Sequence, residues 1–224
     1  MAGLLNVDWS QIPAPENDGA AAHLVGMQIP SMHLPATSGD QIDLSTLQGR
    51  SIVYAYPMTG RPDVPLPEGW DMLPGARGCT PQSCAFRDHA AELKAAGVEA
   101  IFGLSTQDTA YQAEVVERLH LPFALLSDAE LAFMHALKLP NMVVERRTLL
   151  KRLTMVILDG RIEHVFYPIF PPDRNAQDVI NWLAQKASAS AIKLGNPYPF
   201  KHRLLFKGET RLNRCLFNTT NPWT

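Results

Sequence analysis

From residue 50 onward, short apolar segments of strand character alternate with longer segments of helical periodicity. The expected strands are 51–56, 98–104, 123–126, 153–158 and 161–167, and the expected helices are 80–96, 105 or 108 to 120, 128–137 and 172–186. Asp159-Gly160 separates the last two strands in the manner of a tight hairpin turn. This alternation predicts an α/β fold, in which a mixed β-sheet carries helices on both faces.

Two extensions flank this region. Residues 1–25 are polar and rich in turn-forming residues, so we expect a loop-rich lead-in. A hairpin extension around Thr37-Ser38-Gly39-Asp40 then opens a domain that covers 26–187. Residues 188–224 carry six Lys and Arg against a single Glu, a net charge of +5 where the whole chain has −2. We expect this basic C-terminal extension to be disordered.

Composition excludes several classes of protein. The chain has 224 residues, of which 46% are hydrophobic, enough for one buried core with extensions. Without its basic extension the body carries a net charge of −7, which gives no reason to expect nucleic acid as a partner. No apolar run approaches the roughly 20 residues that cross a bilayer, and the first eight residues do not resemble a secretory signal. Three cysteines are too few for a disulfide scaffold, so we expect a reducing compartment, the cytoplasm.

The most informative segment runs from a long loop into a helix. Residues 60–78 contain four prolines and four glycines, which exclude a regular element, and an ordered loop of this length is often functional. Thr80 and Pro81 are the expected N-cap and first residue of the helix that follows. Cys79 therefore lies just ahead of a helix, where unpaired N–H groups and the positive end of the helix dipole lower the pKa of a thiol.

Cys84 follows Cys79 by five residues. In an intact helix the two would lie about 7.5 Å apart along the axis, whereas a disulfide requires Cα atoms about 4.4–6.8 Å apart. The pair can bond only if the first turns of the helix unwind, which predicts a switch that couples redox state to helix order. Two alternatives stay open here: both cysteines are simply small buried residues, or they bind zinc with His89, against which the lack of a C-x-x-C pair counts.

The segment PGARGCTPQSCAFRD at 74–88 resembles the active-site segment of peroxiredoxins and looks closest to their bacterioferritin-comigratory-protein/PrxQ branch. The resemblance continues through GLST at 103–106, LPFALLSD at 121–128 and RLTMVI at 152–157, and it covers about residues 26–187. It implies a thioredoxin-like fold and the thiol-dependent reduction of peroxides, an antioxidant activity. By the same resemblance, Cys79 is the peroxidatic cysteine, Cys84 is the resolving cysteine, and Arg152 braces the thiolate and polarises the peroxide.

One element departs from the family pattern. The family places a Pro and a Thr seven and three residues before the peroxidatic cysteine, where this chain has Met72 and Ala76. Pro57 and Thr59 do follow the right strand, but some nineteen residues separate them from Cys79. Thr59 folds back to supply the usual hydroxyl, or the loop supplies a substitute, or that hydrogen bond is missing. We expect the first.

The expected reaction converts hydrogen peroxide and organic hydroperoxides through a sulfenic acid on Cys79 and a disulfide with Cys84. Thioredoxin or a similar dithiol protein would reduce that disulfide. The reaction needs no metal and no organic cofactor, and we expect a monomer or a homodimer without a membrane partner. Two other functions remain open: a redoxin-fold binding or scaffold protein without peroxidase activity, and a thiol–disulfide oxidoreductase, which the missing C-x-x-C disfavours.

Overall fold

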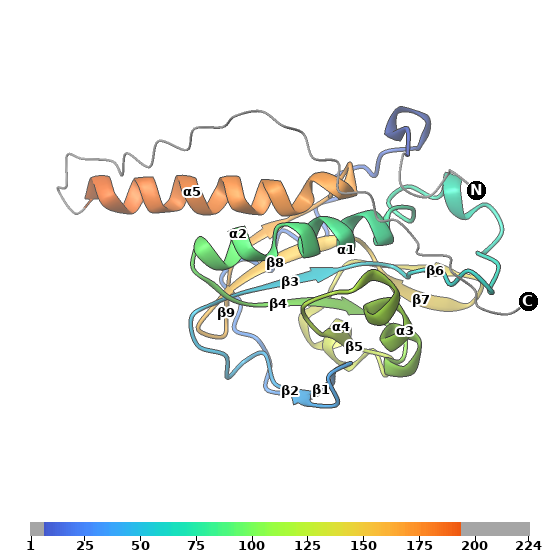
Figure 1. Ribbon diagram of the computed structural model, residues 1–224, viewed down its shortest axis with the longest axis horizontal. Helices are drawn as coiled ribbons and strands as arrows, with labels where there is room; N and C mark the ends of the chain where they lie inside the picture. Colours follow the sequence, from blue (N-terminus) through green and yellow to red (C-terminus); the bar gives the residue numbers. More distant parts are fainter. Residues whose placement is uncertain (1–6, 194–224) are drawn as a thin grey trace, which may run out of the picture.

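The computed structural model describes residues 7–193, and its centre is a five-stranded mixed sheet with the strand order β5-β4-β3-β8-β9 (Figure 1). The strands of this sheet are β3 (Arg50–Ala55), β4 (Val98–Ser105), β5 (Leu125–Ser127), β8 (Leu153–Leu158) and β9 (Arg161–Phe166). The helices are α1 (Cys79–Asp88), α2 (Ala90–Ala95), α3 (Thr109–Leu119), α4 (Ala132–Leu137) and α5 (Asn175–Lys193). The predicted α/β architecture is confirmed.

Strand β3 is the middle strand and determines where the site lies. It pairs in parallel with β4 and antiparallel with β8, so that Ala55 at its end lies opposite Leu153 at the start of β8. Arg152 immediately precedes Leu153 and therefore shares one edge of the sheet with the carboxyl end of β3. The chain leaves β3 at this edge and returns, through the loop 60–78, to begin α1.

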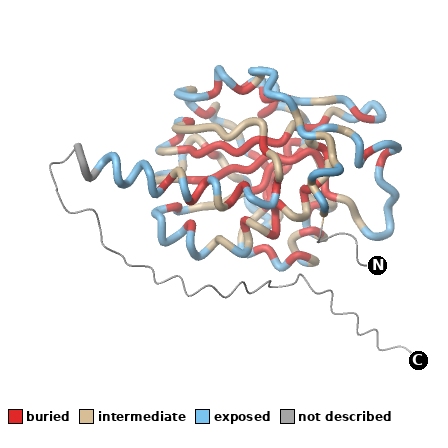
Figure 2. Tube along the Cα trace, turned by 90° about the horizontal axis from the view of Figure 1, so that it is seen from above, coloured by how far each residue is buried: buried red, intermediate tan, exposed pale blue. Residues whose placement is uncertain are grey.

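The side chains of β3 alternate between two cores, as the pleat of a strand requires. Ile52 and Tyr54 belong to the core beneath α1, α3 and α5. Val53 and Ala55 belong to the opposite core, which α4 and residues from the 21–44 region cover. Helices thus lie on both faces, and Figure 2 shows the buried residues concentrated in the central strands while the second half of α5 extends from the body.

Two small hairpins accompany the sheet. The predicted hairpin extension is confirmed as β1 (Leu34–Pro35) and β2 (Gln41–Ile42), which pair antiparallel. The sequence does not predict the second hairpin, β6 (Asn141–Val144) with β7 (Arg147–Leu150). Its turn residues Glu145 and Arg146 have φ of 47° and 66°, a conformation that glycine and asparagine usually mark.

The loop 60–78 has little regular structure, as predicted, but it is anchored. Its only element is the single turn η2 (Trp70–Met72). Trp70 is 5% exposed and packs in a small core with Val144 and Leu149 of the second hairpin. The aromatic side chain therefore fastens the loop against the body of the domain.

Helix α1 begins earlier than predicted. Its first residue is Cys79 and its N-cap is Gly78, so the assignment of Thr80 as N-cap is wrong by two residues. Pro81 is the third helical residue, and it fits there because the first four N–H groups of a helix have no partner within it. The predicted continuous helix to residue 96 is divided at His89 into α1 and α2.

The described residues cover only part of the two predicted extensions. Residues 7–25 contain one short turn, η1 (Trp9–Gln11), and otherwise loops. Helix α5 continues through the predicted boundary at 187 to Lys193, and the rest of the predicted basic extension lies outside the described residues. Within residues 7–193 no helix combines the length and apolar character needed to span a membrane.

Candidate active site

Cys79 is held in place by the glycine before it. The residue is 4% exposed and opens α1. Gly78 adopts φ 105°, and a Cβ on it would lie 2.2 Å from Cγ of Pro172 and 2.8 Å from the ring of Trp9. Only glycine fits this backbone conformation and this space. The sulfur is thereby fixed at the positive end of a ten-residue helix.

The guanidinium of Arg152 lies directly beside this sulfur. Its Nη2 is 3.3 Å from Sγ of Cys79 and 3.1–3.3 Å from the carbonyl oxygens of Gly75, Ala76 and Arg77. The thiol in turn donates to the carbonyl of Ala76 at 3.5 Å. The end of the loop 60–78 therefore wraps the guanidinium and places it against the sulfur, where Arg152 is only 3% exposed.

A buried polar network fixes the other side of the guanidinium. Nη1 of Arg152 donates to Oε1 of Gln82. Nε2 of Gln82 donates to Oδ1 of Asn175 at 3.0 Å, and the hydroxyl of Thr154 donates to the same oxygen at 2.7 Å. Gln82, Asn175 and Thr154 are each at most 1% exposed, so these bonds form in a region of low dielectric constant where they are strong. Nε of Arg152 has no hydrogen-bond partner among the described residues.

The floor beneath α1 is aromatic. Phe86 stacks on Tyr54 with ring centroids 4.5 Å apart, and the Tyr54 hydroxyl lies 3.2 Å from Oγ of Ser83 in a hydrogen bond. Burial raises the pKa of both Tyr54 and Tyr56 well above the ordinary value for tyrosine. Both phenols are therefore neutral at pH 7 and add no negative charge to the neighbourhood of Cys79.

Cys84 lies on the same helix, five residues or about 1.4 turns after Cys79. It is 6% exposed, and no disulfide joins the two sulfurs. Because both residues are helical, the structure is the form in which the disulfide cannot close, and forming it requires the first turns of α1 to unwind.

A cavity of about 510 Å³ borders Arg152 and Gly75. One wall is formed by residues 13–16 of the N-terminal segment, and the others include Met142, Tyr167 and Pro168. Its lining is mostly apolar, and its volume is within the range of small-molecule sites. Four charged residues, Glu16, Asp18, Lys151 and Arg152, also line the cavity, whereas Cys79 does not.

The structure brings Cys79, Cys84 and Arg152 together, but it gives Thr59 another partner. The Thr59 hydroxyl is 3.2 Å from Oε1 of Gln107, and the backbone N–H and C=O of Thr59 also bond to that side chain. The hydrogen bonds of Cys79 within the described residues go to Arg152 and Ala76. The expected hydrogen bond from Thr59 to Cys79 is not made. The long loop separates the two residues, and the Thr59 hydroxyl donates to Gln107 instead.

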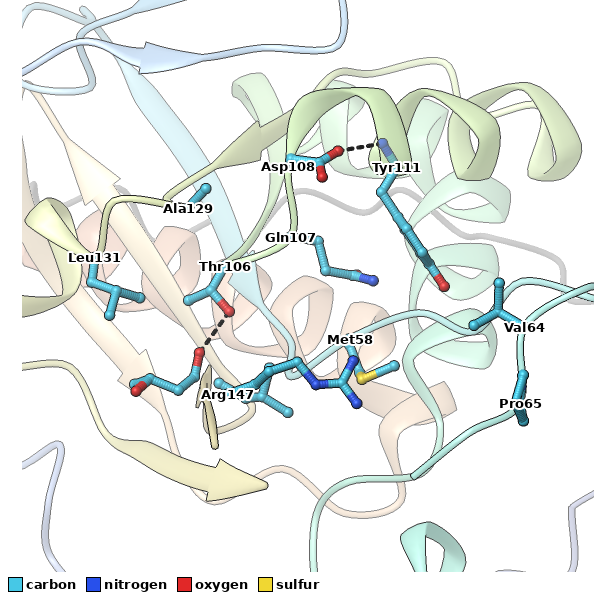
Figure 3. A pocket seen from close by; sticks show the side chains of 12 residues that line it. Met58, Val64, Pro65, Thr106, Gln107, Asp108, Tyr111, Ala129, Leu131 and Arg147 are labelled. Carbon is cyan, nitrogen blue, oxygen red and sulfur yellow. Dashed lines mark hydrogen bonds between the residues drawn. The ribbon is translucent and has the colours of Figure 1, made fainter. Parts of the chain in front are cut away.

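Gln107 belongs to a second cavity, of about 360 Å³ (Figure 3). In Figure 3, Tyr111 and Val64 form one side of it, and Thr106 bonds to the carbonyl of Thr148 on the other. Thr59 is therefore tied to a cavity that Cys79 does not line. This cavity holds no buried polar group without a partner, so we assign it no chemistry.

Two residues of the site are not predicted by the sequence reasoning. Gln82 lies between the two cysteines in the active-site segment 74–88, but nothing in the sequence shows that its side-chain amide accepts a hydrogen bond from Arg152. Asn175 lies 93 residues from Gln82 at the start of α5, and only the fold brings the two together. The zinc alternative gains no support: His89 bonds to Glu92 at 3.1 Å, and the described residues contain no cluster of three His, Cys, Asp or Glu that could hold a metal.

Comparisons with known proteins agree on one family of sequences. A family model described as Redoxin matches residues 24–180. Peroxiredoxin Bcp of Escherichia coli (strain K12) is 32% identical over 163 residues, which cover 70% of this chain and 94% of that protein. Peroxiredoxin Q, chloroplastic, of Oryza sativa subsp. japonica is 31% identical over 160 residues, covering 70% of this chain and 65% of that protein.

Solved structures agree on the fold. The peroxidoxin BcpB from Mycobacterium tuberculosis aligns with a TM-score of 0.58 at 24% identity, covering 72% of this chain and 96% of that one. Peroxiredoxin Q from Xanthomonas campestris aligns with a TM-score of 0.55 at 19% identity. At these identities the likeness shows the fold alone. The matched region begins at residue 24, so the N-terminal segment that lines the cavity lies outside it.

Proposed function

The chain belongs to the Redoxin family and, within it, to the Bcp/PrxQ branch of the peroxiredoxins, and we propose that it reduces peroxides with the sulfur of Cys79. Peroxiredoxins of this branch are thiol-dependent peroxidases, and this chain is one. The observation that carries the assignment of the reacting sulfur is the 3.3 Å contact between Nη2 of Arg152 and Sγ of Cys79 at the start of α1.

In the first step the Cys79 thiolate attacks one oxygen of the peroxide. The O–O bond breaks, the second oxygen leaves with the electron pair and is protonated to water or an alcohol, and the sulfur becomes a sulfenic acid. Negative charge moves from the sulfur to the leaving oxygen in this step. The guanidinium of Arg152, fixed by Gln82, is already in position to stabilise that charge in the transition state.

In the second step the thiol of Cys84 condenses with the sulfenic acid. A sulfur–sulfur bond forms and one water molecule leaves, so the two cysteines together have supplied two electrons. The first turns of α1 have to unwind for the sulfurs to meet, since both cysteines are helical before the reaction.

A dithiol protein such as thioredoxin completes the cycle by thiol–disulfide exchange. The cytoplasm supplies such a reductant, and the scheme uses no metal or organic cofactor. All its groups belong to one chain, so it operates in a monomer or in each half of a homodimer. Organic hydroperoxides are proposed substrates in addition to hydrogen peroxide, because both contain the O–O bond that the thiolate attacks.

The direct test of this function follows peroxide consumption with thioredoxin, thioredoxin reductase and NADPH, for the unaltered chain and for Cys79→Ser. We expect NADPH oxidation that depends on peroxide with the unaltered chain and none above background with Cys79→Ser, because serine is not oxidised by peroxide. Equal rates for the two proteins would contradict the assignment of Cys79.

A further inference from the structure

The N-terminal segment 7–18, here called the strap, lies across the part of the molecule where the reactive helix begins. It is outside the region that the family model matches, which starts at residue 24. In Figure 1 it runs in dark blue over the end of the molecule at which α1 and α5 start. Trp9 and Asp18, near its two ends, form hydrogen bonds with the rest of the domain, and Pro15 between them lies close to Gly75.

Trp9 is the contact at the first end. Its ring lies against Gly78, the N-cap of α1, so closely that a Cβ on that glycine would be 2.8 Å from the indole. The indole N–H donates to Oδ2 of Asp173 at 2.9 Å, and the ring packs edge-on against Phe170 at 5.9 Å between centroids. Trp9 thus joins the start of α1 to the segment that leads into α5.

Asp18 is the contact at the second end. It accepts hydrogen bonds from Nζ of Lys151 at 2.7 Å and from the hydroxyl of Tyr167 at 2.8 Å. The bond from Lys151 is the main cause that holds the pKa of this carboxyl well below its usual range, so Asp18 is ionised at pH 7. Lys151 precedes Arg152, and the strap is therefore fastened beside both members of the reactive pair.

The disulfide requires Cys79 to leave the helical conformation, and Trp9 covers Gly78, the N-cap of that helix. A residue that contacts only the helical form stabilises that form and lowers the population of the unwound one. We propose that Trp9 is a positioning residue for the reaction: it holds the first turn of α1 in the peroxide-reactive conformation and slows the unwinding that lets Cys84 reach the oxidised Cys79. This inference rests on the two-step function proposed above.

The two chemical steps respond differently to such a residue. If the unwound form is about 1% of the population, a tenfold increase brings it to only about 10%, so the helical form that reacts with peroxide is hardly depleted. The step that needs the unwound form accelerates about tenfold. A residue that merely stabilises the fold would not separate the steps in this way.

The test measures both steps in single turnover. Reduced protein is mixed with excess hydrogen peroxide and quenched at intervals with an alkylating agent and a dimedone reagent, and mass spectrometry counts sulfenic acid and disulfide. For Trp9→Ala we expect disulfide formation about tenfold faster, with the rate constant of Cys79 oxidation within twofold of the unaltered chain. Trp9→Phe retains the ring but loses the bond to Asp173, and it should give a smaller acceleration of the same step.

Trp182→Ala is the matched control. It removes an indole of similar partial exposure from α5, where the ring stacks on His164, and it should leave both rates unchanged. Disulfide formation at the unaltered rate in Trp9→Ala, or equal changes in both steps, would overturn the role of Trp9 while leaving the peroxidase function intact. Absence of a Cys79–Cys84 disulfide in the unaltered chain would instead overturn the proposed function itself.

Discussion

The guanidinium of Arg152 serves several acceptors with one planar group. Nη2 faces the sulfur and three carbonyl oxygens, while Nη1 is held by Gln82. A lysine ammonium is a point charge with a different reach and cannot reproduce this two-sided arrangement. A positive charge at this position is therefore not sufficient by itself, because the planar geometry of the guanidinium places that charge beside the sulfur.

Arg152→Lys consequently tests geometry at constant charge. We expect the second-order rate constant for Cys79 with hydrogen peroxide to fall about a hundredfold, the size of effect seen when one preorganised donor is removed from a reacting centre. Stopped-flow measurement of peroxide consumption gives this constant. Arg147→Lys changes an exposed arginine that pairs with Glu145 and should react as the unaltered chain does. A loss of less than threefold in Arg152→Lys would argue against transition-state stabilisation by the guanidinium.

At the same scale, sequence reasoning finds residues whose chemistry is visible locally. Cys79 and Cys84 are identified by their spacing and by the helix start, and the resemblance adds Arg152. The roles of Gln82 and Asn175 are not predicted, because a side-chain amide indicates no function until its hydrogen-bond partner is known. Those partners are distant in sequence. The expectation for Thr59 fails for the same reason, because its hydroxyl donates to Gln107, a residue distant in sequence.

At the scale of elements, the start of α1 depends on Gly78. Its φ of 105° and the closeness of Pro172 and Trp9 to the position that a Cβ would take leave no room for a side chain. Another glycine of positive φ, Gly97, has φ 89° but open space around it. The two positions therefore separate the cost of the backbone conformation from the cost of the steric clash.

We expect Gly97→Ala to lower the free energy of unfolding by about 1 kcal/mol, the conformational term alone. Gly78→Ala should lower it by about 3 kcal/mol or more, since the new methyl group must also displace Pro172 and Trp9. Urea denaturation of the reduced proteins provides both values. Equal decreases in the free energy of unfolding at the two positions would mean that the strap and η3 (Pro172–Arg174) move aside at no cost. Trp9 could not then hold the start of α1 in place.

Elements with strong local signals are predicted well. The strands β3, β4, β8 and β9 and the helix α3, capped by Asp108 at 2.7 Å from the N–H of Tyr111, lie within a few residues of their predicted bounds. The hairpin β6–β7 is missed because its turn, Glu145-Arg146, lacks the glycine or asparagine that usually accepts positive φ. The N-cap of α1 is misplaced because Gly78 offers no side-chain oxygen, whereas Thr80 does.

For the molecule as a whole, the sheet order determines the site and two added segments determine its surroundings. The edge shared by the end of β3 and the start of β8 brings Arg152 to Cys79, a result of topology that the α/β pattern anticipates. The loop 60–78 and the strap then enclose that edge. Their docking could not be read from the sequence, because Trp9, Trp70 and Asp18 are held by residues that only the folded chain places nearby.

The central claim is that one sulfur, Cys79, meets the peroxide and that Cys84 alone resolves it. The most direct test treats the reduced full-length chain with one equivalent of hydrogen peroxide and maps the products by peptide mass spectrometry, in parallel with Cys84→Ser in the presence of dimedone. We expect a single disulfide between Cys79 and Cys84 in the unaltered chain and a single dimedone adduct on Cys79 in the variant. An adduct on another residue, a disulfide to Cys215, which is the third cysteine of the sequence, or unreacted Cys79 would contradict it.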